Sequence, residues 1–498
     1  MQIQHLPPEL LSLVFEHSVE DLDLKASSYI IPLTLSHVSM HWRAVALSTL
    51  DLWSFIFISP SSNGLQLLPS IQLLKHWLAR SGQRPLVFRV TLQRDDNPGQ
   101  GPMPGLNPNA VLRLLATHCF RWHKIDICVA EESHLEGLPA CRAPNLVSMR
   151  VDYHIQSGLA IPIVPGVQLR TLKWKIPWHI RYSKPLSDLL PMGWTQLTKL
   201  ILGKPVISPR DLAALLSSCS SLIHLKLSFS TPLDFGELPK DPVVLSDLRV
   251  FHLGYTGFET YPELFQSLTC PRLEELRVHF PDWAFDEEGQ EMQTAASGSM
   301  ASFIARSQCP LLHLEFDWTL PNTESLMRIL WSVSGSLQTL HCPSRQYHGY
   351  FHSLSELMEM LQVHAGEPVL CPRLTKLALP PSVIENNLDD IGDLLESRRR
   401  LPGFCLDEIH FTMDDNSDLK LLNLAPVCDK VFVDFRTAGI HLAIEDARKA
   451  ISLNLDIVEL WKYNRDLERV RRRRRLLAAL LYAMLVFHVL YLSFTRFF

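Results

Sequence analysis

The sequence has little of what marks a secreted, disulfide-stabilised protein. Its ten cysteines, among 498 residues, include no C-x-x-C pair and follow no regular spacing, which argues against a disulfide framework. The first residues include Glu9 and have no basic stretch before an apolar run, so they lack the pattern of a secretory signal. We therefore expect reduced thiols and a location in the cytoplasm or nucleus.

A strong net charge is also missing. The 47 Lys and Arg residues nearly balance the 52 Asp and Glu residues, which leaves a formal charge of −5. The chain as a whole is therefore no obvious binder of polyanions or polycations. Any electrostatic preference must be local.

Short catalytic motifs are absent as well. The sequence has no P-loop, no G-x-S-x-G elbow and no H-E-x-x-H zinc motif. Gly99, Gly101 and Gly105 superficially suggest a dinucleotide-binding loop, but three residues separate the last two glycines where that motif has two. We therefore predict a binding protein and not an enzyme, with no catalytic residue, no cofactor and no metal ion.

What the chain does contain is a short phrase that recurs from residue 122 onward. It consists of an apolar residue, two others, an apolar residue, one other and an apolar residue, as in residues 222–227 and 374–379. Twelve instances occur, mostly 22 to 28 residues apart, and this interval is typical of leucine-rich repeats. Their second apolar positions are Ile125, Met149, Leu172, Leu200, Leu225, Phe251, Leu276, Leu314, Leu340, Leu377, Ile409 and Val431.

Each phrase predicts one short strand, because residues two apart lie on the same face of a strand. Stretches between phrases, such as residues 209–218 and 353–363, are expected to be helices. The predicted fold class is α/β, a solenoid with parallel strands on its concave side and helices on its convex side. Residues 281–300, rich in Asp, Glu, Gly and Ser, are expected to form an inserted loop.

Cysteine precedes several of the phrases, for example Cys219, Cys270, Cys309 and Cys371. These positions are a repeat apart, without a second close ligand. We expect each small thiol to pack beneath the preceding helix and not to bind a metal.

The residue between the two inward apolar positions of a phrase is expected to face outward. In the early repeats it is often basic, as at Arg150, Lys173, Lys226 and Arg277. We predict that this row receives an acidic or phosphorylated segment of a target, since Arg and Lys bind carboxylate and phosphate well. The alternative is that exposed strand positions are simply often charged.

The first fifty residues predict two amphipathic helices. Pro7 and Pro8 suit a first helical turn, where their missing N–H donors are no loss, so a helix is expected to begin near Pro8. One apolar face then comprises Leu10, Leu11, Val14 and Phe15, and a second helix comprises Leu35, Val38, Trp42 and Val45. Two short helices cannot bury this surface between themselves, so a partner protein is expected. The alternative is an ordinary hairpin packed on the rest of the chain.

These segments, closing on Leu52 and Trp53, resemble an F-box, and the whole resembles the leucine-rich-repeat class of F-box proteins. The resemblance implies that residues 1–58 bind a Skp-type adaptor and, through it, a cullin. It assigns the adaptor-facing or knob-forming surface to Leu6, Pro7, Leu10, Val14, Phe15, Val38, Trp42 and Trp53.

The remaining boundaries follow from these segments. Residues 59–110 are expected to be a connecting segment and linker, 111–440 the leucine-rich-repeat-like solenoid, and 441–475 a helical basic segment that ends in five arginines. Residues 476–494 contain no Asp, Glu, Lys or Arg.

A helix of nineteen residues spans about 28 Å, close to the roughly 30 Å of a bilayer core. We predict that residues 476–494 form a transmembrane tail anchor in an intracellular membrane, with the rest on its cytoplasmic face. The alternatives are a buried helix that caps the solenoid, a misassembled C-terminus and, for the arginines, nuclear import or a nucleic-acid contact. We expect no nucleic-acid partner.

The sequence therefore predicts the substrate-recognition subunit of a Skp-cullin-F-box ubiquitin ligase, whose repeats bind an unidentified target. The alternative is a membrane-attached leucine-rich-repeat scaffold without a degradative role.

Overall fold

The structure is a computed structural model of the chain, and it contains two compact units, Met1–Pro271 (unit 1) and Arg272–Phe498 (unit 2). The residues that it describes are 6–20, 31–61, 67–92, 108–129, 138–153, 163–175, 193–203, 209–228, 242–254, 260–279, 287–316, 323–342, 352–364, 366–379, 388–400, 403, 406, 408–413, 430–435 and 440–443.

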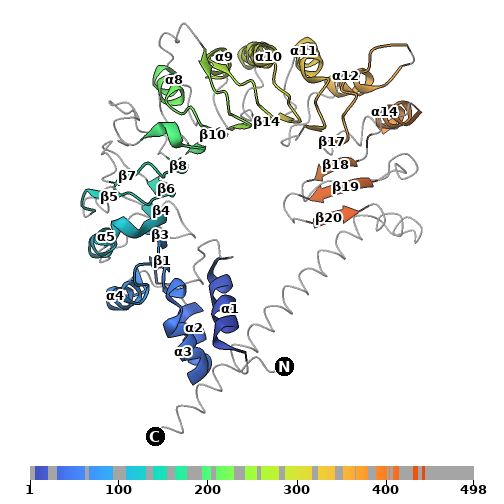
Figure 1. Cartoon of the computed structure of the whole chain (residues 1–498). Coiled ribbons are helices and arrows are strands. Elements are labelled where there is room, and N and C mark those ends of the chain that lie inside the picture. Colours follow the sequence, from blue (N-terminus) through green and yellow to red (C-terminus); the bar gives the residue numbers. More distant parts are fainter. Residues whose placement is uncertain are drawn as a thin grey trace. The chain divides into compact units, whose positions relative to one another are not determined.

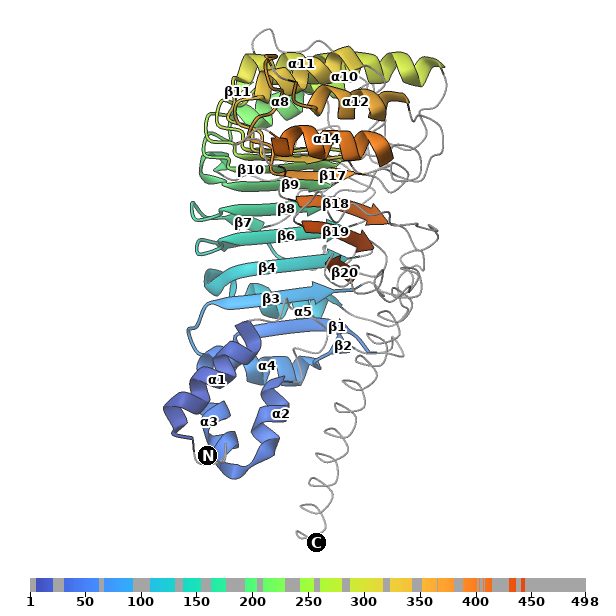
Figure 2. The ribbon, with the colours of Figure 1, turned by 90° about the vertical axis from the view of Figure 1, so that its right-hand side faces the viewer.

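Each unit is α/β and is built on a mostly parallel sheet (Figure 1, Figure 2), which confirms the predicted class. In unit 1 the strands pair in the order β2 (Leu67–Leu68), β1 (Phe55–Pro60), β3 (Leu86–Thr91), β4 (Trp122–Val129), β6 (Ser148–Tyr153), β8 (Thr171–Lys175), β9 (Lys199–Gly203), β10 (His224–Ser228) and β12 (Val250–Gly254). In unit 2 the order is β14 (Glu275–Val278), β15 (His313–Phe316), β16 (Thr339–His341), β17 (Lys376–Leu379), β18 (Glu408–Met413), β19 (Lys430–Phe435) and β20 (Ile440–Ala443).

Helices lie on one face of each unit's sheet (Figure 1). In unit 1 these are α4 (Ile71–Arg80), α5 (Pro108–Ala116), α8 (Pro209–Ser217) and α9 (Thr260–Gln266). In unit 2 they are α10 (Glu287–Ser307), α11 (Thr323–Val333), α12 (His352–Leu361) and α14 (Leu388–Arg400). We call the opposite face of each sheet its open face.

Short elements complete unit 1. Two further parallel pairs form, β5 (Cys141–Ala143) with β7 (Ile163–Pro165), and β11 (Val243–Val244) with β13 (Leu268–Thr269). Single 3-10 turns are η4 (Cys119–Arg121) and η5 (Trp194–Gln196).

All twelve predicted positions lie on strands, and within each unit they stand opposite one another. The row in unit 1 is Ile125, Met149, Leu172, Leu200, Leu225 and Phe251. The row in unit 2 is Leu276, Leu314, Leu340, Leu377, Ile409 and Val431. The unit 1 row is buried throughout. A slip of one residue would turn these side chains to the open face, so their burial fixes the register.

The sheet begins earlier than predicted. β1 and β3 pair in parallel, with Phe55 opposite Val87 and Ile58 opposite Val90, although residues 59–110 were expected to be only a connection. Ile56, Phe57 and Ile58 are all buried. A strand covered on both faces is continuously apolar and does not alternate, which is why the repeating phrase did not detect β1.

The loop predicted at residues 281–300 is wrong for most of its length, because α10 begins at Glu287. Its residues Ala296, Met300, Phe303 and Ile304 are buried and follow the spacing of one helical face. This spacing outweighs the loop-forming tendency of the Gly and Ser residues around it.

At the N-terminus α1 (Pro8–Glu20) begins where it was predicted to begin. The predicted second helix is instead two helices, α2 (Ile31–Val38) and α3 (Met40–Ser48). Ser39 separates them with an extended backbone, and its Oγ accepts a hydrogen bond from the Trp42 N–H at 3.1 Å. This N-cap satisfies a free donor of α3 and ends α2.

The turn η3 (Leu50–Trp53) joins α3 directly to β1. Trp53 is 0% exposed. Its Nε1 donates to the carbonyl oxygen of Ala46 at 2.8 Å, its ring centroid lies 6.0 Å from that of Trp77, and the Arg80 guanidinium lies 4.8 Å above it. One side chain therefore ties α3 to α4.

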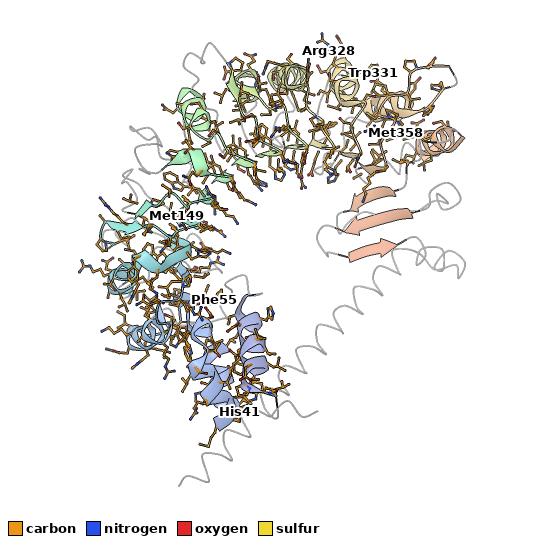
Figure 3. The ribbon with its side chains drawn as sticks, in the orientation of Figure 1. His41, Phe55, Met149, Arg328, Trp331 and Met358 are labelled. Atoms are coloured by element: carbon orange, nitrogen blue, oxygen red, sulfur yellow. The ribbon has the colours of Figure 1, made fainter. Side chains whose placement is uncertain are left out.

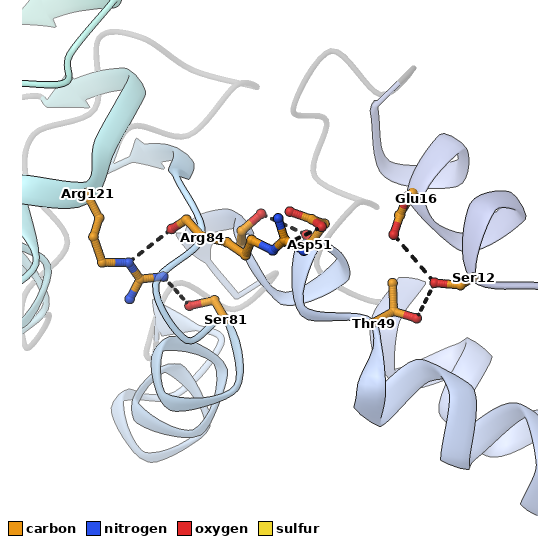
Figure 4. A network of polar contacts seen from close by, with 8 residues as sticks. Ser12, Glu16, Thr49, Asp51, Ser81, Arg84 and Arg121 are labelled. Atoms are coloured by element: carbon orange, nitrogen blue, oxygen red, sulfur yellow. Dashed lines mark hydrogen bonds and ion pairs between the residues drawn. The ribbon is translucent and has the colours of Figure 1, made fainter. Parts of the chain in front are cut away.

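Polar contacts follow the same connection (Figure 4). The hydroxyls of Ser12 and Thr49 are 2.9 Å apart and link α1 to the end of α3. Arg121 donates from Nη2 to Ser81 Oγ at 2.7 Å and from Nε to the Arg84 carbonyl at 3.0 Å. Arg84 and Asp51 form an ion pair at 3.3 Å, but both are partly exposed and it contributes little.

In unit 2 the buried side chain of Arg398 on α14 holds the segment between α12 and β17 by hydrogen bonds to its backbone. Arg398 is 0% exposed and donates to the carbonyl oxygens of Leu361, Leu370 and Cys371 at 2.8, 2.7 and 3.1 Å. Burial lowers the pKa of its guanidinium to about 10, so the side chain is still charged at neutral pH and saturates three buried acceptors.

Among helices in the described part of the chain, none combines the length and apolar character that crossing a bilayer requires. The predicted tail anchor at 476–494 lies outside the described residues, as do the glycines at 99–105 and most of segment 441–475. Residues 441–443 belong to β20 and are a strand, whereas a helix was predicted there.

Replacing Trp53 with Ala is expected to lower the free energy of unfolding by about 3–5 kcal/mol, since it empties a large buried site and orphans the Ala46 carbonyl. Hydrogen exchange should then rise in α3, β1 and β3, and urea denaturation gives the magnitude. Trp331→Ala is the matched control, because Trp331 on α11 is 44% exposed (Figure 3) and should cost far less. Equal decreases in the free energy of unfolding for the two variants would contradict the role of Trp53 in holding α3 against α4.

Candidate binding surfaces

The N-terminal helices keep apolar side chains at their surface. Leu10, Leu13 and Val14 on α1 are each about half exposed, and Met40 at the start of α3 is 89% exposed. Val38 and Leu47 are also exposed. Single exposed apolar residues are ordinary, but six on three short helices that pack together make these helices a candidate protein-binding surface.

The same helices have a core of their own. Leu11, Phe15 and Val19 are buried along one face of α1, and the Phe15 ring lies 5.2 Å from the Trp42 ring, centroid to centroid. α1 is thus apolar on two sides, one inward and one outward.

This division separates the residues that were predicted to face the adaptor or to form the knob. Pro7, Leu10, Val14 and Val38 are exposed, and Leu6 and Trp42 are half-buried. Phe15 and Trp53 are buried within the chain, so they form the knob but offer no surface to a partner. Leu13, Met40 and Leu47 were missed, because the sequence was read as a single apolar stripe for each helix.

The open face of unit 1 is strongly basic. Alternation places the residues between the buried ones on this face, and Figure 3 shows side chains extending from it. Across β3 to β12 its ionisable residues are Arg89, Lys124, Asp126, Arg150, Asp152, Lys173, Lys175, Lys199, Lys226, His224 and His252. Seven Lys and Arg against two Asp leave five positive charges, although the whole chain carries −5.

The two carboxylates neutralise only one end of this face. Asp126 lies 3.4 Å from Arg89 and 3.7 Å from Arg150, and Asp152 lies 3.3 Å from Lys175 and 3.9 Å from Arg150. Burial raises the pKa of Asp126, against the opposing effect of both arginines. Arg150, which was predicted to bind a target, therefore already faces two carboxylates.

The other cations of the face are crowded together. Within the described residues Lys124, Lys173, Lys199 and Lys226 have no carboxylate within ion-pair distance. The pKa of Lys173 is lowered, first by burial and then by the charges of Lys199, Arg150 and Lys124. Like charges held this close repel one another and raise the free energy of the open face when no anion is bound to it.

Neither a protein-family model nor a curated protein matches this chain.

Arg277, the fourth basic residue predicted to bind a target, belongs to unit 2 and has carboxylate partners. Its Nε lies 2.6 Å from Glu275 Oε1, and its Nη1 lies 3.4 Å from Glu315 Oε2. Glu315 also contacts His279 at 3.4 Å and His341 at 3.2 Å. The open face of unit 2 around β14 to β16 thus balances its own charge, and Arg277, which was predicted to bind a target, already faces two carboxylates.

The cysteines that precede the strand phrases are buried, as predicted from their packing role. Burial raises the pKa of the Cys219 and Cys371 thiols to about 12 and that of Cys309 to about 11, so they stay protonated at neutral pH. Within the described ranges no group of three or more His, Cys, Asp or Glu side chains is arranged to hold a metal ion.

Glu315 gives unit 2 an acid-sensitive stability. Burial alone would raise the pKa of this carboxyl, but the hydrogen bond and charge of His341, with His279 and Arg277, outweigh burial and lower it to about 2. A carboxyl whose folded-state pKa lies below its ordinary value of 4.5 stabilises the fold above pH 4.5 and loses this contribution as the pH falls toward 2.

We expect that contribution to be on the order of 3 kcal/mol. Urea denaturation of the full chain between pH 6 and pH 2.5, followed by a signal from unit 2, should show this decrease in the free energy of unfolding. Glu315→Gln should have a lower free energy of unfolding at pH 6, and that free energy should fall less on acidification than in the unchanged chain. Glu367→Gln, an exposed control on the same unit, should behave as the unchanged protein. Parallel pH profiles for the Glu315 variant and the unchanged chain would contradict this role.

Proposed function

We propose that this chain is a non-catalytic target-recognition subunit of a Skp-cullin-F-box ubiquitin ligase. In this proposal α1 to α3 and η3 form the F-box, and the parallel strands with their helices form a leucine-rich-repeat solenoid. The observation that carries it is the outward apolar side of α1 with Met40 of α3, left exposed beside a complete inner core.

The attachment of these helices supports the same function. Trp53 is locked between α3 and α4, and β1 follows η3 without an intervening linker. A ligase receptor has to hold its target in a fixed place relative to its adaptor, and a short rigid junction suits this task better than a flexible connection.

The target surface that we propose is the open face of unit 1. Its surplus of five positive charges fits an acidic or phosphorylated segment of a protein. Lys173 and Lys226 are retained from the sequence prediction, Arg150 contributes with part of its charge already engaged, and Arg277 is dropped because of its contacts with Glu275 and Glu315.

Changing Leu10 and Leu13 together to Asp is expected to reduce recovery of a Skp-type adaptor and cullin with the tagged chain by at least about tenfold, because charged groups cannot be buried unpaired in an apolar interface. Val167→Asp is the control, since Val167 is 68% exposed on unit 1 away from the N-terminal helices. Co-purification from native cells, with circular dichroism to check folding, measures the effect.

Three outcomes are informative. Loss of adaptor and cullin only in the double variant supports the ligase proposal. Recovery of adaptor without cullin from the unchanged chain favours the membrane-attached scaffold. Unchanged adaptor recovery from the double variant contradicts the assignment of this surface.

The membrane anchor is a separate proposal that rests on the apolar character of residues 476–494. We expect the full chain to stay in the membrane pellet after carbonate extraction, whereas a chain that ends at residue 475 should be released. Release of the full chain would contradict the anchor and leave the adaptor proposal untouched.

A further inference from the structure

The strand register of unit 1 brings two hydroxyls between four cations on the open face. Ser148 on β6 stands opposite Lys124 on β4 and opposite Thr171 on β8, and Thr171 stands opposite Lys199 on β9. Neighbouring strands are about 4.8 Å apart. The two hydroxyls are therefore adjacent, and a lysine stands one strand beyond each of them.

The next position along the same strands adds two more cations. Arg150 follows Ser148 by two residues on β6, and Lys173 follows Thr171 by two on β8, so all four point to the open face. Arg150 and Lys173 stand opposite each other. Lys124, Arg150, Lys173 and Lys199 thus surround the hydroxyls of Ser148 and Thr171 on three sides.

Asp126 and Asp152 neutralise only the Arg150 corner of this group, and among the described residues Lys124, Lys173 and Lys199 have no carboxylate within ion-pair distance. Ser148 and Thr171 are only partly exposed, and neither hydroxyl has a partner among the described residues. The contacts of Arg150 with Asp126 and Asp152, at 3.7 and 3.9 Å, are longer than hydrogen bonds, so its donors can still serve another acceptor. The pKa of Lys173 is lowered by burial and by the three neighbouring cations, and an anion between them would relieve this repulsion.

We infer that the hydroxyls of Ser148 and Thr171, with Lys124, Arg150, Lys173 and Lys199, bind a phosphoryl group carried by a side chain of the target protein. A phosphorylated side chain carries about two negative charges and three acceptor oxygens, which matches two hydroxyl donors inside four cations. A carboxylate brings one charge and two oxygens and would leave most of these cations unbalanced. The inference rests on the proposed function only in taking the phosphoryl group to be on a protein.

The test is fluorescence anisotropy on the full chain with three labelled random peptide libraries, centred on phosphothreonine, threonine or glutamate. We expect the phosphothreonine library to bind at least about tenfold more tightly than the other two. Comparable binding of the glutamate library would overturn the assignment to a phosphoryl group.

Two variants locate the site. The double variant Lys124→Ala, Lys199→Ala should bind the phosphothreonine library at least about tenfold more weakly than the unchanged chain. The double variant Ser148→Ala, Thr171→Val keeps every charge and should bind it at least about fivefold more weakly. The matched control removes two exposed cations from other parts of unit 1, Lys75→Ala with Arg142→Ala, and should bind within about twofold of the unchanged chain. Unchanged binding by the hydroxyl variant would overturn the site.

Two further measurements separate this inference from the function proposed above. Inorganic phosphate that competes as effectively as the phosphothreonine peptides would overturn the claim that the group is borne by a protein. Adaptor co-purification should be unaffected by the Lys124 and Lys199 changes. Loss of peptide binding with adaptor retained supports the site, and loss of both in these variants overturns its independence from the adaptor surface.

Discussion

The shared register of the parallel strands is the constraint on which the rest of the structure depends. In each unit the second apolar residue of one phrase stands opposite its equivalent in the next, and the buried side of the sheet holds all of them in place. Because every strand is aligned, the residues between the buried ones also form straight rows. The chemistry of an open face is therefore fixed by residues some 25 positions apart in the sequence, which the fold brings to neighbouring strands about 4.8 Å apart.

The N-terminal helices are held against this sheet by buried side chains and not by a flexible linker. The indole of Trp53 fills the space between α3 and α4, and the Ser12–Thr49 contact holds α1 against the end of α3. Phe15 and Trp42 complete the interior of the helices. The inner face of α1 is thus covered by the chain itself, whereas Leu10, Leu13 and Val14 on its other side each leave about half of their surface exposed. An outward apolar side of this kind is what the proposed adaptor contact would cover.

The sequence predicted the strands well because one short pattern recurs and every recurrence reinforces the others. It predicted the ends of the pattern poorly. β1 is buried on both faces and does not alternate, and α10 has its apolar face among many Gly and Ser residues. The break at Ser39 depends on a single side-chain cap, which competes with helix propensity over a margin of about 1 kcal/mol. The local composition of the sequence does not predict a helix break that depends on so small a free-energy difference.

The residues predicted to bind a target show the same limit at finer scale. Arg150 and Arg277 were predicted to bind a target from their charge alone. The row that contains them also contains Asp126 and Glu315, and the register makes these pairs immediate neighbours. The charges along one strand do not predict which cations are paired, since the carboxylate partner comes from the adjacent strand. Cross-strand neighbours must be read together.

A slightly acidic chain can present a basic surface because residues far apart in the sequence become neighbours on adjacent strands. Cations that stand on directly adjacent strands of unit 1, such as Lys173 and Lys199, have backbones closer together than the screening length of about 10 Å at ordinary salt, and the charge of Lys199 lowers the pKa of Lys173. Asp126 and Asp152 relieve such repulsion only beside Arg89, Arg150 and Lys175. Lys124 and Lys199 have no such carboxylate within ion-pair distance among the described residues. The sheet is held by its buried apolar row, so the open face can keep a surplus of positive charge among the described residues without loss of the fold.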